Sequence, residues 1–364
     1  TFNRWYDFLE LYVADQTPLL NSAVITTAAQ VVSQMAMGLP QADLVTLPVD
    51  PIQLDLTYDA AYADFNKLPE IRMLFDNGAG ADPLGQHVAG NPYPAFEKSF
   101  SSWPIPGTVA HTWYLGAKGS LASKPSATRG ADTYKSDPRA LPANDFSGST
   151  GGGGLWGNAS QWHWNWKPNP SGTAVSYITS PLKTDTTVIG AGAIHVWVKS
   201  AAPDVDLQAT VSEVDPGGHE TFVQNGWMRA SERKLATGSH TIFAQPSTLL
   251  APVPSFLQKD SAPMPKGKFT EVVIPLYYEG HVYRAGTRIR ITIAAPNGTQ
   301  PIWSFQHPIP AKGTTKVSIA FSKSMPSSLV LPVVPAVSVP TAIPPCGSLR
   351  NEPCRPYVTT ANQR

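Results

Sequence analysis

Beyond residue 108 the chain is built from short segments in which apolar and polar residues alternate, and residues that favour turns separate these segments. In 193–200, for example, Ile194, Val196 and Val198 would face one side of a strand and the residues between them the other. Strands that follow one another with turns between them, without intervening helices, are typical of a β-sandwich. The predicted strands are 109–115, 131–135, 174–179, 186–189, 193–200, 205–214, 219–225, 269–276, 287–294 and 315–321, with a hairpin turn at 215–218.

The first forty residues follow a helical period instead. Apolar residues recur at i, i+3, i+4, i+7, i+10 and i+11 and predict one buried helix face. They are Phe2, Trp5, Tyr6, Leu9, Tyr12 and Val13. This helix would end at Pro18, and a second helix is predicted over 19–37. Because nothing else in the first hundred residues obviously supplies a surface for so aromatic a face, we expect it to dock on something large.

The elements between these two regions are shorter. A short helix is predicted over 58–66 and a buried strand over 70–75, which ends at turn residues 76–78. Residues 102–108, with two prolines, read as a rigid linker. From Pro326 to Pro345 we expect a polyproline-like arm that is laid along the surface and stays outside the core.

Composition narrows the range of partners. The 364 residues include 36 prolines, which disfavour long helices, and only 15% are charged, with a net charge of +1. Nucleic acid is not expected as a partner, because neutralising phosphates needs a basic surplus. No window approaches the ~20 consecutive apolar residues of a helical membrane span. Since Thr1 is not a start residue, we expect a processed product or a fragment.

The two cysteines, Cys346 and Cys354, lie close together near the end of the chain. Their spacing favours a small disulfide loop in a secreted protein over two free thiols. Zinc is not expected there, because no nearby histidine or second cysteine pair would complete its coordination. We therefore expect an extracellular or cell-envelope location, no metal and no other cofactor.

No catalytic nucleophile is recognisable. The elbow of a serine hydrolase needs Gly-x-Ser-x-Gly, because its strained turn tolerates no side chain on either flank. Several serines near glycines lack the glycine two positions earlier: Ser120, Ser149, Ser160, Ser239 and Ser348. The glycine-rich run at 148–154 is not a phosphate loop, because Leu155 and Trp156 follow it where Lys and Ser or Thr would be needed.

The histidines and acids form no obvious site. The eight histidines lack the spacing of metal ligands. His195 is expected to be an ordinary surface or interface residue. His163 lies in a tryptophan-rich segment that either lines a binding surface or plugs the end of the sandwich, and the pattern leaves both open. Asp76, after a strand, looks like the acid of a triad, with His87 or His111 as its partner, but there is no serine for them to serve.

A series of motifs in fixed order carries a resemblance. They are Trp5-Tyr6-Asp7-Phe8-Leu9, Ile71-Arg72-Met73-Leu74, Trp103-Pro104-Ile105-Pro106, Trp113-Tyr114-Leu115-Gly116, Asp132-Thr133-Tyr134 before Asp137-Pro138, Tyr177-Ile178-Thr179-Ser180-Pro181-Leu182, the run 200–207, Gly226-Trp227-Met228-Arg229-Ala230-Ser231 and the run 281–290. To about residue 330, the chain resembles the C-terminal half of the cocaine esterase and X-Pro dipeptidyl-peptidase family of serine hydrolases. The order of the motifs makes the resemblance specific.

The resemblance implies a mainly β fold: a jelly-roll (galactose-binding-like) β-sandwich preceded by the helical C-terminal tail of an α/β-hydrolase domain. The implied domains are the hydrolase tail at 1–104, the sandwich at 105–335 and a proline-rich tail at 336–364. The aromatic helix would pack on the missing hydrolase sheet, and Asp76 would align with a strand beyond the triad. In the family the jelly roll helps to wall the substrate pocket, which assigns Leu155 and Trp156 here as substrate-binding residues.

The implied function is the C-terminal part of a serine hydrolase that acts on esters or amides. Its nucleophile, acid and histidine would lie upstream of Thr1, so no catalytic residue is assigned in this chain. The implied partners are the missing hydrolase domain or subunit and a small ester or peptide substrate, and a homodimer stays open. The alternative is a stand-alone jelly-roll module that binds carbohydrate or another ligand without catalysis. Such a module would have no reason to carry the apolar helix at 2–13.

Overall fold

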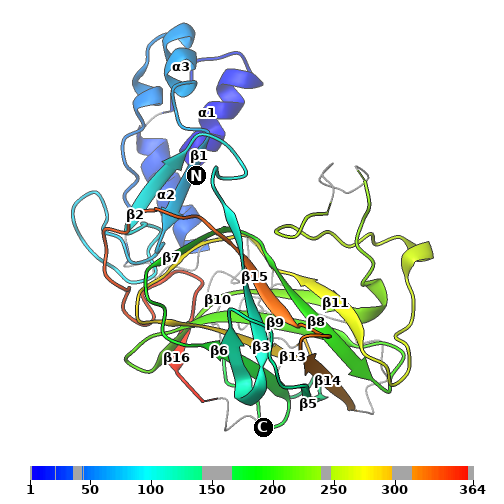
Figure 1. Cartoon of the computed structure of the whole chain (residues 1–364). Helices are drawn as coiled ribbons and strands as arrows, with labels where there is room; N and C mark the ends of the chain where they lie inside the picture. The colour runs from blue at the N-terminus through cyan, green and yellow to red at the C-terminus, as the bar shows by residue number, and fades with distance from the viewer. Residues whose placement is uncertain are drawn as a thin grey trace. The chain divides into compact units, whose positions relative to one another are not determined.

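The computed structural model describes residues 2–20, 22–35, 43, 45–141, 166–238, 247–296 and 314–359 (Figure 1). The chain divides into two compact units: described residues up to Pro106 belong to the first and those from Gly107 onward to the second. Within this part of the chain, no helix combines the length and the apolar character that crossing a membrane requires.

The described residues of the first unit form three α-helices, all of which the sequence predicted. They are α1 (Phe2–Tyr12), α2 (Ser22–Met35) and α3 (Tyr58–Phe65). Helix α3 begins where the hydroxyl of Thr57 accepts a hydrogen bond from the amide of Ala60 at 3.3 Å, an N-cap. A 3-10 helix at Pro51–Leu54 precedes α3, and the Asp50 carboxylate caps it.

Helix α1 has a partner within the first hundred residues, so the expectation that none is available there was wrong. The side chain of Leu11 is fully buried in a small cluster with Ile52 and Ala61. The Tyr12 ring lies 5.3 Å from that of Tyr62 and 5.9 Å from that of Phe65, both on α3. The aromatic spacing of α3 was the signal for this contact.

The unit also contains a two-stranded antiparallel sheet. Strand β1 (Ile71–Phe75) pairs with β2 (Phe96–Phe100), which was not predicted. Of the β1 side chains only Phe75 is buried, so the prediction of a buried strand was wrong for the rest of β1. The Phe75 ring stacks on Phe96 at 4.8 Å, and a ribbon of two strands buries little beyond such a cross-strand pair.

In the second unit, the described residues form one 14-stranded, hydrogen-bonded sheet. Its strands are β3 (Val109–Gly116), β4 (Ser120–Ala122), β5 (Gly130–Ser136), β6 (Ala174–Thr179), β7 (Thr186–Gly190), β8 (Ala193–Ser200), β9 (Asp206–Val214), β10 (His219–Arg229), β11 (Thr270–Pro275), β12 (Glu279–Tyr283), β13 (Arg288–Ala294), β14 (Thr315–Phe321), β15 (Ser328–Val333) and β16 (Cys354–Pro356). The main path runs β16-β10-β9-β13-β6-β4-β3-β15-β8-β14-β5, and every pair is antiparallel except β4 with β6. The mainly β fold is thereby confirmed.

All ten strands predicted beyond residue 108 are present, although their ends shift by a few residues. The alternation in β8 places Ile194, Val196 and Val198 in the core, as predicted. The predicted turn joins β9 to β10, because the amide of Asp215 bonds the carbonyl of His219 at 2.9 Å. Strands β4, β12, β15 and β16 were missed.

The most important correction concerns the predicted surface arm that begins at Pro326. Strand β15 lies between β3 and β8 in the sheet, and Leu329 and Leu331 are fully buried in the main core (Figure 1). Pro332 stands where the neighbour of β15 changes from β8 to β7, a position at which a missing amide hydrogen is tolerated. Proline frequency suggested an exposed arm, but the alternating leucines fit a strand.

Candidate functional site

The residues predicted to wall a substrate pocket, Leu155 and Trp156, lie outside the described residues, as does His163. Trp166, at the end of the same segment, is described. The guanidinium of Arg355 lies 3.6 Å from the centre of its ring, and Phe222 meets the ring edge-on at 5.7 Å. Arg355 thereby makes a cation–π contact from the C-terminal end of the chain.

The other candidates from the sequence have separate surroundings. Asp76 is buried at the turn after β1, where its carbonyl accepts the amide of Ala79 at 3.0 Å. His87 is exposed in the same unit, whereas His111 belongs to β3 in the second unit and lies 4.1 Å from the ring of Trp113. His195 is half-buried on β8 with its Nδ1 3.5 Å from a carboxylate oxygen of Glu271.

A group of ionisable side chains that the sequence reasoning missed surrounds His281 of β12. We call His281, Glu213, Glu279 and Glu352 the histidine cluster. Nε2 of His281 lies 2.9 Å from Oε2 of Glu213, and Nδ1 lies 3.4 Å from Oε2 of Glu352. The other oxygen of Glu213 accepts the amide of Arg284 at 3.0 Å. Both ring nitrogens therefore face carboxylates.

The shifts in pKa in this cluster follow from burial and charge. Burial disfavours the charged form of His281, but Glu213 and Glu352 outweigh it and raise its pKa well above the ordinary value. Burial also opposes ionisation of Glu213, yet the hydrogen bond and charge of His281 lower its pKa. The carboxyl of Glu279 is buried without a hydrogen-bond partner, although the amide of Gln224 is nearby, and burial raises its pKa to about 8.

A second group, the arginine cluster, consists of Glu220, Arg290 and Arg355. Glu220 of β10 and Arg290 of β13 are fully buried, and their ion pair spans 2.5 Å. The other carboxylate oxygen of Glu220 accepts two bonds from Arg355, at 2.9 and 3.1 Å. Ser212 donates to Glu220 at 2.7 Å. Burial by itself would raise the pKa of Glu220, but the charges of Arg290 and Arg355 outweigh burial and lower this pKa.

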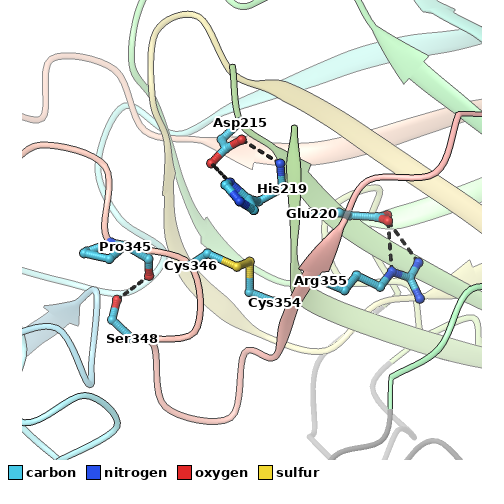
Figure 2. The surroundings of a disulfide bond; sticks show 8 residues. All are labelled: Asp215, His219, Glu220, Pro345, Cys346, Ser348, Cys354 and Arg355. Carbon is cyan, nitrogen blue, oxygen red and sulfur yellow. Dashed lines mark hydrogen bonds and ion pairs between the residues drawn. A yellow bond between two sulfur atoms is a disulfide. The ribbon is translucent and has the colours of Figure 1, made fainter. Parts of the chain in front are cut away.

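One segment contributes to both clusters. We call residues 341–357 the C-terminal strap. The disulfide between Cys346 and Cys354 confirms the predicted loop (Figure 2). Cys354 opens β16, which pairs with β10, and Glu352 and Arg355 are the members that the strap supplies. A small hollow separates the strap from the β9–β10 hairpin; its lining includes Glu213, Asp215 and Thr221, with strap residues 343–347 and 349.

This geometry is not that of a catalytic centre. A general base must have a nitrogen free to accept a proton, whereas both nitrogens of His281 face carboxylates that keep it protonated. Within the described ranges, no set of His, Cys, Asp and Glu side chains could hold a metal ion. The charged residues among the apolar positions of β9, β10 and β13 were the sequence signal that could have revealed these clusters.

Exposed apolar and aromatic side chains occur in both units. On α1, Trp5 and Phe8 are 60% and 47% exposed, and Val13 just beyond the helix is 69% exposed; we call these three the α1 face. In the second unit, the ring of Tyr277 meets that of Trp227 at 5.5 Å while remaining about half exposed. Apolar surface of this kind often marks a place where another molecule binds.

Residues 63–329 match the profile of the X-Pro dipeptidyl-peptidase C-terminal non-catalytic domain, which is most of the chain. The chain belongs to this family. The resemblance inferred from the ordered motifs is thus confirmed, and the family's description as non-catalytic agrees with the two structural clusters.

Among curated proteins, the chain is 25% identical over 207 residues to a Mycobacterium bovis protein named as a serine esterase, covering 56% of this chain and 31% of that protein. It is 26% identical over 207 residues to the cocaine esterase of Rhodococcus sp. The matched region covers 54% of this chain and 31% of that protein. The chain thus spans about a third of the length of these relatives. A CocE/NonD family hydrolase structure from Staphylococcus aureus is 17% identical with a TM-score of 0.50, covering 74% of this chain and 42% of that one, and shows a shared fold.

Proposed function

We propose that this chain is the non-catalytic part of a serine hydrolase that acts on esters or amides. The match to a non-catalytic hydrolase domain carries the proposal. The names of two relatives, serine esterase and cocaine esterase, support an ester or amide as the substrate class. The chemistry would be acyl transfer through a serine, a histidine and oxyanion donors in a catalytic domain outside these residues.

In this proposal the 14-stranded sheet is a jelly roll that walls the substrate pocket and stabilises the catalytic domain, and residues 1–104 are the tail of an α/β-hydrolase domain. The α1 face supports the assignment of residues 1–104 as the tail of a hydrolase domain. Its three side chains stay exposed even though Leu11 of the same helix is fully buried against Ile52 and Ala61. Exposed rings beside a covered face are what a helix shows when its second partner lies elsewhere.

The first experiment assays the full chain by itself with p-nitrophenyl esters, with and without a serine-directed fluorophosphonate. We expect no inhibitor-sensitive turnover. Robust turnover that the inhibitor abolishes would place a nucleophile within these residues and overturn the proposal.

The second experiment is to sequence the gene upstream of the codon for Thr1, where we expect an in-frame Gly-x-Ser-x-Gly elbow. An upstream region without such an elbow would count against a serine hydrolase.

We also propose an extracellular or cell-envelope location, which the disulfide supports because such bonds persist in oxidising compartments.

The alternative function is that of a ligand-binding module without catalysis. One observation favours it, the exposed Tyr277 beside Trp227. Aromatic pairs of this kind can stack on sugar rings. Retention of the chain on immobilised polysaccharides, lost in Tyr277→Ala, would favour this alternative over the hydrolase.

A further inference from the structure

The C-terminal strap is attached along the edge of the large sheet by contacts at both ends. At its start, Nη2 of Arg284 donates to the hydroxyl of Thr341 at 3.0 Å. At its end, the amide of Tyr357 bonds the carbonyl of Gly218 at 2.8 Å, and the amide of Phe222 bonds the carbonyl of Pro353 at 2.9 Å. The strap therefore lies across β9, β10 and β12 and covers one end of this part of the sheet.

The strap adds to charge pairs that are complete without it. Under one part, Glu213 and His281 already form an ion pair, to which the strap adds the negative Glu352. Under the other, Glu220 and Arg290 form an ion pair, to which it adds the positive Arg355. If the strap leaves, each buried group keeps an opposite partner. Since an uncompensated buried charge is the main cost of breaking such clusters, removal of the strap avoids that cost.

The apolar core is also independent of the strap. The main hydrophobic cluster of the second unit ends with Leu331 of β15, and among the described residues beyond that point only Val333 packs against it. No described strap residue belongs to this cluster. The sheet can thus keep its core while the strap is bound or released, which is the condition for two folded states.

The disulfide is the one covalent restraint on this arrangement. It closes a loop with a sequence separation of 8, and that loop carries Glu352. Of the two cysteines, Cys346 is exposed and Cys354 is half-buried, so Cys346 is the one that a thiol would reach first. Exposed disulfides are the ones that thiol reductants attack readily. Opening the loop increases the number of conformations of the free strap and so favours its release.

We propose that the C-terminal strap is a redox-controlled cover: the Cys346–Cys354 disulfide holds it on the sheet, and a thiol reductant releases it without unfolding the core. A thiolate of a dithiol attacks Sγ of Cys346, forming a mixed disulfide and freeing the Cys354 thiolate. The second thiol of the reductant closes its own disulfide and frees Cys346. Two electrons and two protons pass from the dithiol to the two cysteines. Release uncovers Glu220, His281 and the outer edge of β10.

Hydrogen exchange on the full chain, with and without dithiothreitol at neutral pH, tests this proposal. In the reduced protein we expect exchange to rise in peptides that cover 341–357 and 219–224, on the order of 50-fold for a loop of this length. Peptides from β8 should still exchange far more slowly than those of the strap in the reduced protein, because the strap is released while the core stays folded. The double variant Cys346→Ser/Cys354→Ser should match the reduced protein and show no further response to dithiothreitol.

Limited trypsin digestion gives an independent measure in the wild-type protein, even if the double variant fails to fold. Arg350 lies within the disulfide loop, so cleavage after it should be slow in the oxidised protein and faster after reduction. Unchanged exchange and unchanged cleavage would show that the disulfide does not hold the strap. Exchange of β8 as fast as that of the strap in the reduced protein would show that the strap and the sheet unfold together. Either result overturns the proposal.

Discussion

Arg290 and Arg355 make the same type of contact to Glu220 but differ in burial. Arg290 is fully buried, whereas Arg355 comes from the strap and keeps some exposure. Arg290→Met should lower the free energy of unfolding by about 3–5 kcal/mol, because it breaks a fully buried ion pair. Arg355→Met should cost only about 1–2 kcal/mol, because Glu220 keeps Arg290. Urea unfolding of both variants measures the difference, and an equal or larger loss for Arg355→Met would show that the pair beneath the strap is not self-sufficient.

Glu279 should make the free energy of unfolding depend on pH between about 4.5 and 8. Its pKa is about 8 when folded and 4.5 ordinarily, so between these values the folded state holds a proton that the unfolded state has lost. The free energy of unfolding therefore falls as the pH rises through this window, by up to about 5 kcal/mol from this group. His281, with its raised pKa, acts in the same direction. Glu213 and Glu220 have lowered pKa values and therefore act in the opposite direction. Their contribution to the free energy of unfolding is lost as the pH falls below about 4.5.

Glu279→Gln should flatten the loss between pH 5 and 8, as melting temperatures across this range would report. The matched control is Glu271→Gln, because Glu271 is a half-exposed glutamate on β11, the strand that precedes β12 in the chain. We expect the control to keep the slope of the wild type. A slope that persists in Glu279→Gln would assign the titration to another group.

At the scale of single elements, β15 shows why a proline-rich segment can still be core. Leu331 is fully buried between β3 and β8, so Leu331→Ala should cost about 2–5 kcal/mol. Ile343, in the strap, is partly exposed, and Ile343→Ala should cost well under this. Thermal or urea unfolding separates the two. Similar small losses of unfolding free energy in both variants would show that 326–345 is a surface arm, as its prolines suggested.

The disulfide should also contribute to global stability as an element. By loop-closure entropy, losing a bond across so short a loop costs about 2–3 kcal/mol when the strap is bound. The double variant Cys346→Ser/Cys354→Ser should therefore unfold at lower urea concentration, while its far-ultraviolet circular dichroism stays that of a β protein. Loss of the β signal would mean that the sheet cannot form without the bond.

At the scale of the whole molecule, the proposed catalytic domain should cover the α1 face. In a protein that contains both parts, Trp5→Ser should lower the free energy of unfolding by about 1–3 kcal/mol, because a buried indole would be lost from the contact. In the chain by itself the same change should have little effect, since Trp5 is 60% exposed. The control is Leu84→Ser, which changes a more exposed apolar residue of the same unit and should be neutral in both proteins.

Features that depend on residues close together in the sequence could be predicted, whereas features that depend on contacts between distant residues could not. The helices at 2–12 and 58–65, and strands such as β8, were predictable because their periodicity is a property of neighbouring residues. The family was predictable because its motifs keep their order along the chain. The two clusters were not, since Glu213 meets His281 across 68 residues and Glu220 meets Arg355 across 135.

Local pattern therefore indicated a mainly β protein with a helical start and a disulfide loop near its end, and the resemblance of the ordered motifs indicated the hydrolase-associated family. Only the tertiary structure showed that the last segment pairs with β10 and places one charge of each sign into buried clusters. The physical reason is that strand register and burial depend on partners far away in the sequence. A glutamate in a strand looks the same in sequence whether water or an arginine faces it.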